Sequence, residues 1–307
     1  MQLRGAVLGL GQMGRHHSRI LKSSPRVVYV GGVEIERAAS AVDDEQVYRS
    51  LDYLFAETAG IDFAVIALPT AMHPEASVAL AAEGVNLLIE KPLALNLAEG
   101  ASIIDACKRG QVHAAVGHVE RYNPALVKMK QLLASGGLGR PTAIITERTG
   151  PAPRGIRDAG VISDLATHDL DLIPWLVDEP IDTLSAQTSS PSHEHLAFVT
   201  GRMASGVVFN TVVDWLSPVR SRRVRVVCDE GTVVADTLNT RLVRLTNEAT
   251  EVPLPPVDPL AAQIDAFCDL LVGDDDAPVV SLEEGLRAVA CAEAALRSAH
   301  EQRVITV

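Results

Sequence analysis

The stretch GLGQMG at residues 9–14 decides the fold of the N-terminal part of this 307-residue chain. It ends the nearly continuous apolar run LRGAVLGLG at residues 3–11, which is typical of a strand buried on both faces of a parallel sheet. We expect a helix after the glycines and a second strand over VVYVGGVE at residues 27–34. The order of strand, glycine-rich turn, helix and strand predicts a dinucleotide-binding unit.

Each glycine of this turn has a physical reason. Gly9 and Gly11 leave bare backbone where a pyrophosphate would approach the helix N-terminus, and Gly14 lets the helix pack closely on the strand. Glu34 ends the second strand, where a carboxylate accepts hydrogen bonds from the adenosine ribose. That carboxylate would repel a 2'-phosphate, so NAD is favoured over NADP, although the nearby Arg37 weakens this preference. The alternative is a glycine loop in another doubly wound protein.

The alternation of strands and helices continues as far as residue 118. Strands are predicted at 62–69, 86–92 and 113–119, and helices at 73–84 and 96–110. We therefore predict an α/β fold that begins with a doubly wound parallel sheet, a Rossmann domain over residues 1–118.

From residue 119 to residue 307 the pattern changes to a second domain. Helices are predicted at 123–137, 163–177, 258–273 and 281–300. Strands are predicted at 143–149, 182–190, 195–203, 206–216, 222–229, 232–237 and 241–246. This order predicts an α/β domain with a large, mostly antiparallel sheet.

Charge and cysteine usage exclude several classes of function. The formal net charge of −12 disfavours binding to nucleic acid or to an anionic membrane. The four cysteines are scattered singly, which argues against a disulfide framework or a metal cluster, and we expect no metal site. With no leader pattern and no long apolar run, we expect a cytoplasmic protein.

Five motifs in order resemble the Gfo/Idh/MocA family of oxidoreductases. They are GLGQMG at 9–14, ALPTAMHPE at 67–75, IEKPLA at 89–94, GHVERYNPA at 117–125 and GVISDLATHDLD at 160–171. The resemblance implies NAD(P)-dependent redox chemistry on carbohydrates. It also implies a C-terminal domain whose open sheet makes a homodimer or homotetramer.

Three residues are candidates for catalysis. Oxidation of a secondary alcohol needs a base for the hydroxyl proton and a group that tolerates alkoxide character. Asp164 and His168 are four residues apart on a predicted helix and so share one face, while Lys91 ends a predicted parallel strand, where ligands bind in such sheets. The resemblance implies that His168 is the acid/base, that Asp164 orients the substrate and that Lys91 faces the reacting hydroxyl. It also implies that the Lys91–Pro92 peptide bond is cis.

Taken singly, these residues have simpler interpretations. A lysine before a proline is usually a surface charge, and an Asp–His pair four residues apart is usually a helix-surface pair. The residues predicted to contact the cofactor are Gly9, Gly11, Gln12, Met13, Gly14, Glu34, Pro69, Thr70, His73 and Glu90. Among these we expect Glu90 to brace its loop.

The substrate is predicted from arginines that precede the catalytic helix. Arg148, Arg154 and Arg157 would suit an anionic substrate, because guanidinium groups match phosphate oxygens. The alternative is that they pair with local acids or contact a neighbouring subunit. Arg121 and Asn123 are further candidates to line the pocket.

The segments around these arginines resemble the branch of the family that acts on nucleotide sugars. We therefore predict NAD-dependent oxidation of a ring hydroxyl of a sugar, with the 3-hydroxyl of UDP-N-acetylglucosamine as the best candidate. The alternatives are a dehydrogenase of free sugars or myo-inositol, a redox-neutral NAD-dependent glycosidase, and a regulator that senses sugar or NAD without catalysis.

Overall fold

A computed structural model describes residues 2–34, 46–152, 160–190 and 194–307. The chain divides into two compact units, Met1–Val119 with Leu260–Leu286, and Glu120–Pro259 with Arg287–Val307. The predicted division at residue 118 differs from these units in one respect. Residues 260–286, far along the sequence, group with the first unit.

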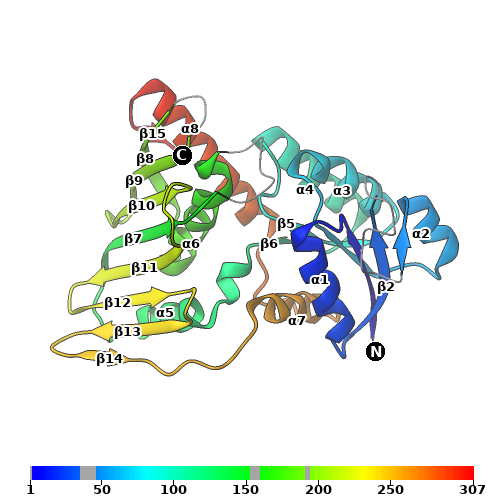
Figure 1. Cartoon of the computed structure of the whole chain (residues 1–307), viewed down its shortest axis with the longest axis horizontal. Helices are drawn as coiled ribbons and strands as arrows, with labels where there is room; N and C mark the ends of the chain where they lie inside the picture. Colours follow the sequence, from blue (N-terminus) through cyan, green and yellow to red (C-terminus); the bar gives the residue numbers. More distant parts are fainter. Residues whose placement is uncertain (1, 35–45, 153–159, 191–193) are drawn as a thin grey trace. The chain divides into compact units, whose positions relative to one another are not determined.

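The first unit is built on a six-stranded parallel sheet with the strand order β3-β2-β1-β4-β5-β6 (Figure 1). Its strands are β1 (Leu3–Leu8), β2 (Val27–Val33), β3 (Val47–Tyr48), β4 (Phe63–Ile66), β5 (Asn86–Glu90) and β6 (Ala114–Gly117). Its helices are α1 (Gln12–Ser23), α2 (Leu51–Glu57), the 3₁₀ turn η2 (Thr70–Met72), α3 (His73–Ala82), α4 (Leu97–Gly110) and α7 (Pro259–Leu271). The predicted doubly wound parallel sheet is confirmed.

Helices α1 and α7 pack on one hydrophobic cluster of this sheet. Ile20 and Leu21 of α1 and Ile264 of α7 are buried there with residues of β1 and β4. The rings of Phe63 and Phe267 meet edge to face with their centroids 5.7 Å apart. Helix α7, although it comes late in the sequence, is therefore part of the core of the first unit.

Helix α4 begins where the sequence predicted it to begin. Asn96 accepts a hydrogen bond from the backbone N–H of Glu99 at 2.9 Å, and the carboxylate of Glu99 accepts one from the backbone N–H of Leu95 at 3.1 Å. Such reciprocal capping satisfies N–H groups that the first turn of a helix leaves unpaired. Two other elements of this unit, β3 and α2, were not predicted, because both are too short to show a period.

The second unit is built on a nine-stranded sheet with the order β14-β13-β12-β11-β7-β10-β9-β8-β15. The strands are β7 (Pro141–Thr149), β8 (Ile181–Thr188), β9 (Leu196–Met203), β10 (Val208–Asp214), β11 (Ser221–Cys228), β12 (Gly231–Asp236), β13 (Arg241–Leu245), β14 (Ala249–Glu251) and β15 (Ile305–Thr306). Strands β7 and β10 pair in parallel and the other pairs are antiparallel. This confirms the prediction of a mostly antiparallel sheet.

One face of this second sheet carries the core of the unit. Helices α5 (Pro124–Ala134), α6 (Thr167–Val177) and α8 (Leu282–Glu301) contribute buried residues to the same cluster as the strands (Figure 1). The short turns η3 (Val119–Tyr122) and η4 (Ile162–Ala166) precede α5 and α6. The three helices thus leave the opposite face of the sheet to side chains such as Ile145, Phe198 and Val208, which are exposed.

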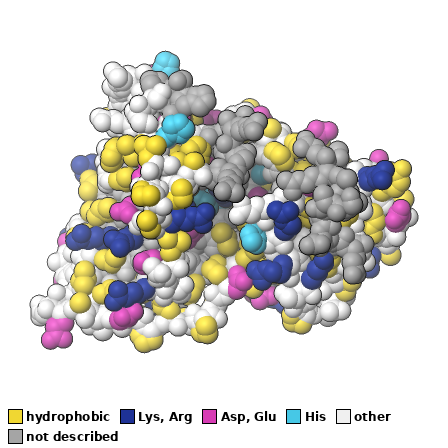
Figure 2. All heavy atoms as spheres, in the orientation of Figure 1, with side chains coloured by type: hydrophobic (Ala, Val, Ile, Leu, Met, Phe, Trp, Pro, Cys, Tyr) yellow, Lys and Arg dark blue, Asp and Glu magenta, His cyan; other side chains and the backbone are white. Residues whose placement is uncertain are grey.

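That opposite face carries several exposed apolar side chains. Hydrophobic side chains lie among basic ones over the strands of the second sheet (Figure 2), and Phe198 is 46% exposed. Within the described part of the chain, no helix is long and apolar enough to cross a membrane.

Candidate functional site

The glycine-rich turn connects β1 to α1 in a conformation that needs its glycines. Gly9 has φ +84°, and a Cβ there would lie 2.7 Å from the carbonyl oxygen of Ala67. A Cβ on Gly14 would overlap the carbonyl oxygen of Gly9 itself. Gly11, in contrast, has no described atom within 4 Å of its Cβ position. Gly9 and Gly14 therefore serve the fold, while Gly11 keeps open the space in front of the helix.

The N-terminus of α1 suits an anionic group. Gly11 is its N-cap and provides no side-chain capping bond, and its first turn holds no acidic residue. The N–H groups at such an end are unpaired within the helix and point outward, with the positive end of the helix dipole behind them. Gln12 and Met13 lie in this first turn. The geometry fits the pyrophosphate of a dinucleotide.

Glu34 lies at the carboxyl end of β2, beside this turn. Its Oε2 accepts a hydrogen bond from the backbone N–H of Leu10 at 3.0 Å. The carboxylate is half-buried and is thus held against the loop that would receive the cofactor. This placement fits recognition of the adenosine ribose.

The turn after β4 holds Pro69, Thr70 and His73, and the histidine is buried. One ring nitrogen, Nε2, lies 3.0 Å from the carbonyl oxygen of Leu68, and Nδ1 lies 3.1 Å from that of Pro92. Burial lowers the pKa of His73, in spite of these carbonyl groups and of the charge of Glu90. His73 therefore joins two loops as a neutral ring, and any effect on the cofactor passes through the backbone that it holds.

Glu90 and Lys91 follow each other at the end of β5. Glu90 is buried, and its Oε1 lies 2.7 Å from Nε2 of His17 on α1. Its Oε2 accepts the backbone N–H of Lys91 at 3.2 Å. Burial acts to raise the pKa of Glu90, but His17 and then Lys91 outweigh it and hold the pKa below its usual value. The carboxylate is therefore ionised and fixes the backbone from which Lys91 extends.

The peptide bond between Lys91 and Pro92 is cis, as the resemblance implied. The sequence analysis did not anticipate the part played by His17. The sequence does contain a signal for it, because this histidine is three positions after Gly14 and faces the sheet from the helix that the glycine turn opens. Its contact with Glu90 spans 73 positions and could not be found from spacing.

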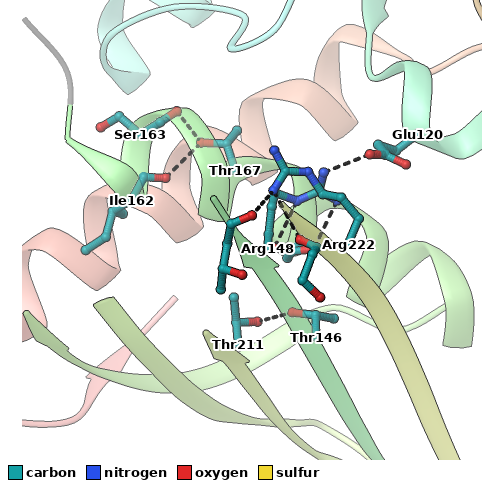
Figure 3. A network of polar contacts seen from close by, with 11 residues as sticks. Glu120, Thr146, Arg148, Ile162, Ser163, Thr167, Thr211 and Arg222 are labelled. Atoms are coloured by element: carbon teal, nitrogen blue, oxygen red, sulfur yellow. Dashed lines mark hydrogen bonds and ion pairs between the residues drawn. The ribbon is translucent and has the colours of Figure 1, made fainter. Parts of the chain in front are cut away.

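In the second unit, Asp164 and His168 lie on two consecutive elements. Asp164 is in the π-helical turn η4, and His168 is in the first turn of α6, and both side chains are half-buried. The hydroxyl of Thr167 donates to the carbonyl oxygen of Ser163 at 2.8 Å and contacts that of Ile162 at 3.3 Å (Figure 3). Wide helical turns of this kind are frequent at functional sites. We predicted a continuous α-helix here, and the structure corrects that prediction.

Arg148 lies at the centre of a buried ionic network beneath this turn. Its guanidinium donates to Glu120 at 2.7 Å and to both carboxylate oxygens of Asp169 at 3.3 Å (Figure 3). Burial acts against its charge, but the two carboxylates outweigh burial and raise the pKa of Arg148. This arginine is therefore engaged by acids, as the alternative interpretation held, although these acids are distant in the sequence rather than local.

The remaining substrate candidates are Arg121, Asn123, Arg154 and Arg157. Arg121 is buried and forms a two-point ion pair with Asp171, with N–O distances of 2.9 and 2.5 Å. Asn123 caps α5 and donates to the carbonyl oxygen of Thr237 at 3.2 Å. Arg154 and Arg157 lie outside the described residues. A role in substrate binding stays a prediction for all four.

A small cavity of about 80 Å³ opens beside Asp164 in the second unit. It is lined by Gly150, Pro151, Asp164, Leu165, Asp214, Trp215, Arg220 and Arg222. Arg220 and Arg222 were not among the predicted site residues, because they lie more than fifty positions from Asp164. Over the described ranges, no three His, Cys, Asp or Glu side chains are grouped as a metal site.

Comparison with known families matches both halves of the chain. Residues 3–118 match the oxidoreductase family with an NAD-binding Rossmann fold, GFO_IDH_MocA. Residues 126–234 match the GFO/IDH/MocA C-terminal domain.

Individual relatives and one solved structure agree with this family. The UDP-N-acetylglucosamine 3-dehydrogenase of Acidithiobacillus ferrooxidans is 31% identical over 88% of this chain and 89% of its own. A crystal form of that dehydrogenase covers 98% of this chain and 99% of its own with a TM-score of 0.86 and 27% identity. The NAD(+)-dependent scyllo-inositol 2-dehydrogenase of Bacillus subtilis is 31% identical over 60% of this chain and 56% of its own.

Proposed function

Because the chain belongs to the Gfo/Idh/MocA family and is an NAD-dependent oxidoreductase of sugars or polyols, we propose that it oxidises the 3-hydroxyl of UDP-N-acetylglucosamine. The observation that carries this substrate is the similarity to the Acidithiobacillus dehydrogenase, which extends over nearly nine-tenths of both chains. The similarity to the Bacillus inositol dehydrogenase covers little more than half of each. An inositol 2-dehydrogenase of Paenarthrobacter aurescens also matches the whole chain, but at 25% identity, so the higher identity of 31% to the Acidithiobacillus enzyme favours the nucleotide sugar.

NAD bound to the first unit supplies the acceptor for the hydride that leaves the sugar carbon. Gly11, Gln12 and Met13 offer backbone N–H groups to its pyrophosphate, and Glu34 accepts from its ribose. Pro69 and Thr70 contact the cofactor at the turn after β4. Glu90 and His73 are buried and hold the backbone of these loops through hydrogen bonds.

Three residues carry the proton chemistry in this proposal. His168 takes the proton of the sugar hydroxyl as general base, because a ring nitrogen of an imidazole can accept a proton. Asp164, one turn earlier, orients the substrate by accepting its hydrogen bonds. Lys91 donates to the hydroxyl oxygen and stabilises its alkoxide character, while Glu90 holds the backbone of that lysine.

A homodimer or homotetramer through the open face of the second sheet is part of the same proposal. Support comes from the exposed apolar side chains Ile145, Phe198 and Val208 on three neighbouring strands. Exposed apolar patches of this kind usually mark an interaction surface. A cytoplasmic location stays a prediction.

The test measures the formation of NADH through its near-ultraviolet absorbance. Purified protein and NAD are incubated separately with nucleotide sugars, free sugars and inositols. The proposal expects NADH with UDP-N-acetylglucosamine. Formation of NADH only with inositols or free sugars would show that one of these, and not the nucleotide sugar, is the substrate. Hydrolysis of a glycoside without accumulation of NADH would point to the redox-neutral glycosidase, and sugar binding without turnover to a regulator.

A further inference from the structure

The cavity beside Asp164 is too small for a whole substrate. Its volume of about 80 Å³ is well below the roughly 300–1,000 Å³ of complete ligand pockets. It is therefore suited to one group of a larger molecule. Because Asp164 is part of its wall, a substrate held by this aspartate would bring a neighbouring group to the cavity.

Positive charge accumulates on one side of this cavity. Arg222 of β11 lies beside Arg148, as Figure 3 shows, and Arg220 lines the cavity two residues earlier. The hydrogen bonds of the Arg222 guanidinium go to backbone carbonyl oxygens, those of Thr149 at 3.2 Å and Ser221 at 3.3 Å. The nearby acids Glu120 and Asp169 are bound by Arg148 instead. Arg222 is thus a partly buried cation whose nearest acids are already engaged.

The electrostatic environment of Arg222 agrees with this excess of positive charge. Burial lowers its pKa to about 10, together with the charges of Arg148 and Arg220, and Glu120 and Asp169 do not compensate for them. An anion in the cavity would stabilise the charged form of Arg222.

Two carboxylates, those of Asp164 and Asp214, line the cavity, and they have different roles. Asp214 accepts the backbone N–H groups of Leu216 and Ser217 and the hydroxyl of Ser217, at 2.7 to 2.9 Å. These bonds hold the turn that leads from β10 toward the arginines. Asp164 is the second carboxylate and belongs to the proposed catalytic pair. Asp214 therefore stabilises the turn, and Asp164 is proposed to bind the sugar.

Gly150 keeps Arg220 against the cavity. This glycine has φ +157°, and a Cβ on it would lie 2.9 Å from Cγ of Arg220. The backbone after β7 thus packs directly on the aliphatic part of the arginine. Trp215 completes the wall with an aromatic surface, and its ring centroid lies 6.2 Å from that of His195.

We propose that Arg220 and Arg222 form an anion subsite of the substrate pocket, next to Asp164, that binds the phosphate groups of the nucleotide-sugar substrate. The proposal rests on the proposed function for the identity of the anion. A guanidinium group can donate two parallel hydrogen bonds to phosphate oxygens. Two arginines therefore suit a subsite that binds the substrate and takes no part in the reaction. The aromatic wall of Trp215 offers an apolar surface to the same substrate.

The first test is Arg220→Ala, because Arg220 is exposed and its loss should leave the fold intact. Loss of a charge-assisted hydrogen bond should raise KM for UDP-N-acetylglucosamine by about tenfold or more, with kcat and the KM for NAD little changed. Arg222→Lys keeps the charge but loses the planar fork, and should raise the same KM. The matched control is Arg223→Ala, which removes an arginine from the same strand but from its opposite, exposed face. Equal KM values in Arg220→Ala and Arg223→Ala would overturn the proposal.

A binding experiment separates the subsite from the proposed function. UDP, as a probe for the phosphates, should bind to the wild type in calorimetry and lose at least about tenfold in affinity in Arg220→Ala, whichever sugar the enzyme oxidises. If the enzyme oxidises polyols and not UDP-N-acetylglucosamine, the proposed function fails, and the subsite then predicts that UDP inhibits polyol oxidation in the wild type and not in Arg220→Ala. Glucuronate in place of UDP distinguishes a carboxylate subsite from a phosphate subsite. Equal binding of UDP to wild type and variant would overturn the phosphate assignment.

Discussion

His17 and Glu90 form a buried pair in which the imidazole Nε2 lies 2.7 Å from the carboxylate Oε1. The pair joins the helix that follows the glycine-rich turn to the end of β5, where Lys91 begins its loop. The same carboxylate accepts the backbone N–H of Lys91. A contact within the core of the first unit thus positions the residue proposed to meet the substrate.

Glu90→Gln should lower both stability and activity, because it leaves His17 without an ionised partner and loosens the loop of Lys91. The pKa of Glu90 in the folded protein is below its usual value of 4.5. The contribution of ionised Glu90 to the free energy of unfolding is therefore present above that pH and is lost as the pH falls through the folded-state pKa. The difference in melting temperature between wild type and Glu90→Gln should shrink on acidification below about pH 4.5. The exposed Glu83→Gln is the control, and a difference that stays constant with pH would contradict this account.

Gly11→Ala and Gly14→Ala should separate cofactor binding from folding. Gly11 has φ −63° and open space at its Cβ position, so its alanine variant should fold normally and bind NAD weakly. Gly14→Ala forces a methyl group onto the backbone of Gly9 and should cost about 1–3 kcal/mol of stability. Thermal melts and NAD titrations distinguish the two effects. Equal loss of stability in both variants would show that Gly11 serves the fold.

Glu34→Ala should weaken the binding of NAD and reduce the preference for NAD over NADP. The variant removes a charged acceptor from the loop, and losing such a hydrogen bond costs about 1.5–3 kcal/mol, or roughly ten- to hundredfold in KM for NAD. The KM for the sugar should change little. Steady-state kinetics with both cofactors measure this, and an unchanged ratio of the two KM values would exclude Glu34 from ribose recognition.

His168→Ala should lower kcat by about 10²–10⁴-fold, the usual contribution of a general base. NAD binding should stay at the wild-type level, because the glycine-rich turn belongs to the other unit. Asp164→Asn should act mainly on KM for the sugar if it orients the substrate. His300→Ala, at an exposed position on α8, is the control. A His168→Ala variant with wild-type kcat would remove the histidine from the mechanism.

Phe198→Asp should dissociate the proposed oligomer. It places a charge at the centre of the exposed apolar face of the second sheet, where burial of an unpaired carboxylate is unfavourable. Light scattering coupled to size exclusion should show a smaller particle than for the wild type. Val272→Asp changes an exposed valine of the first unit and should leave the mass unchanged. A monomeric wild type would refute the oligomer.

The elements with a local signal could be predicted from the sequence. The glycine turn, the alternation of strands and helices up to residue 118 and the cap formed by Asn96 and Glu99 all depend on neighbours close in the chain. The strands predicted at 195–203 and 206–216 and at 222–229 and 232–237 likewise form the antiparallel pairs β9–β10 and β11–β12, each joined by a short turn.

What could not be predicted depends on contacts between distant residues. The partners of Arg148 are Glu120 and Asp169, which lie 28 and 21 positions away in the sequence and are brought to it by the fold. A buried hydrogen bond of 2.9 Å between the hydroxyl groups of Thr146 and Thr211 stabilises the parallel pair of β7 and β10 (Figure 3). The periodicity of the sequence does not indicate this contact. The π-helical turn at Asp164 likewise has the composition of an ordinary helix.

The most direct test of the central claim uses UDP-N-acetylglucosamine that carries deuterium at ring carbon 3, incubated with NAD and the purified protein. Mass spectrometry of the recovered cofactor should find the deuterium in the reduced nicotinamide, and far less should appear with His168→Ala after the same incubation time. Reduced cofactor without deuterium would show that another carbon is oxidised. No reduced cofactor from this sugar, with an active enzyme on inositols, would contradict the account.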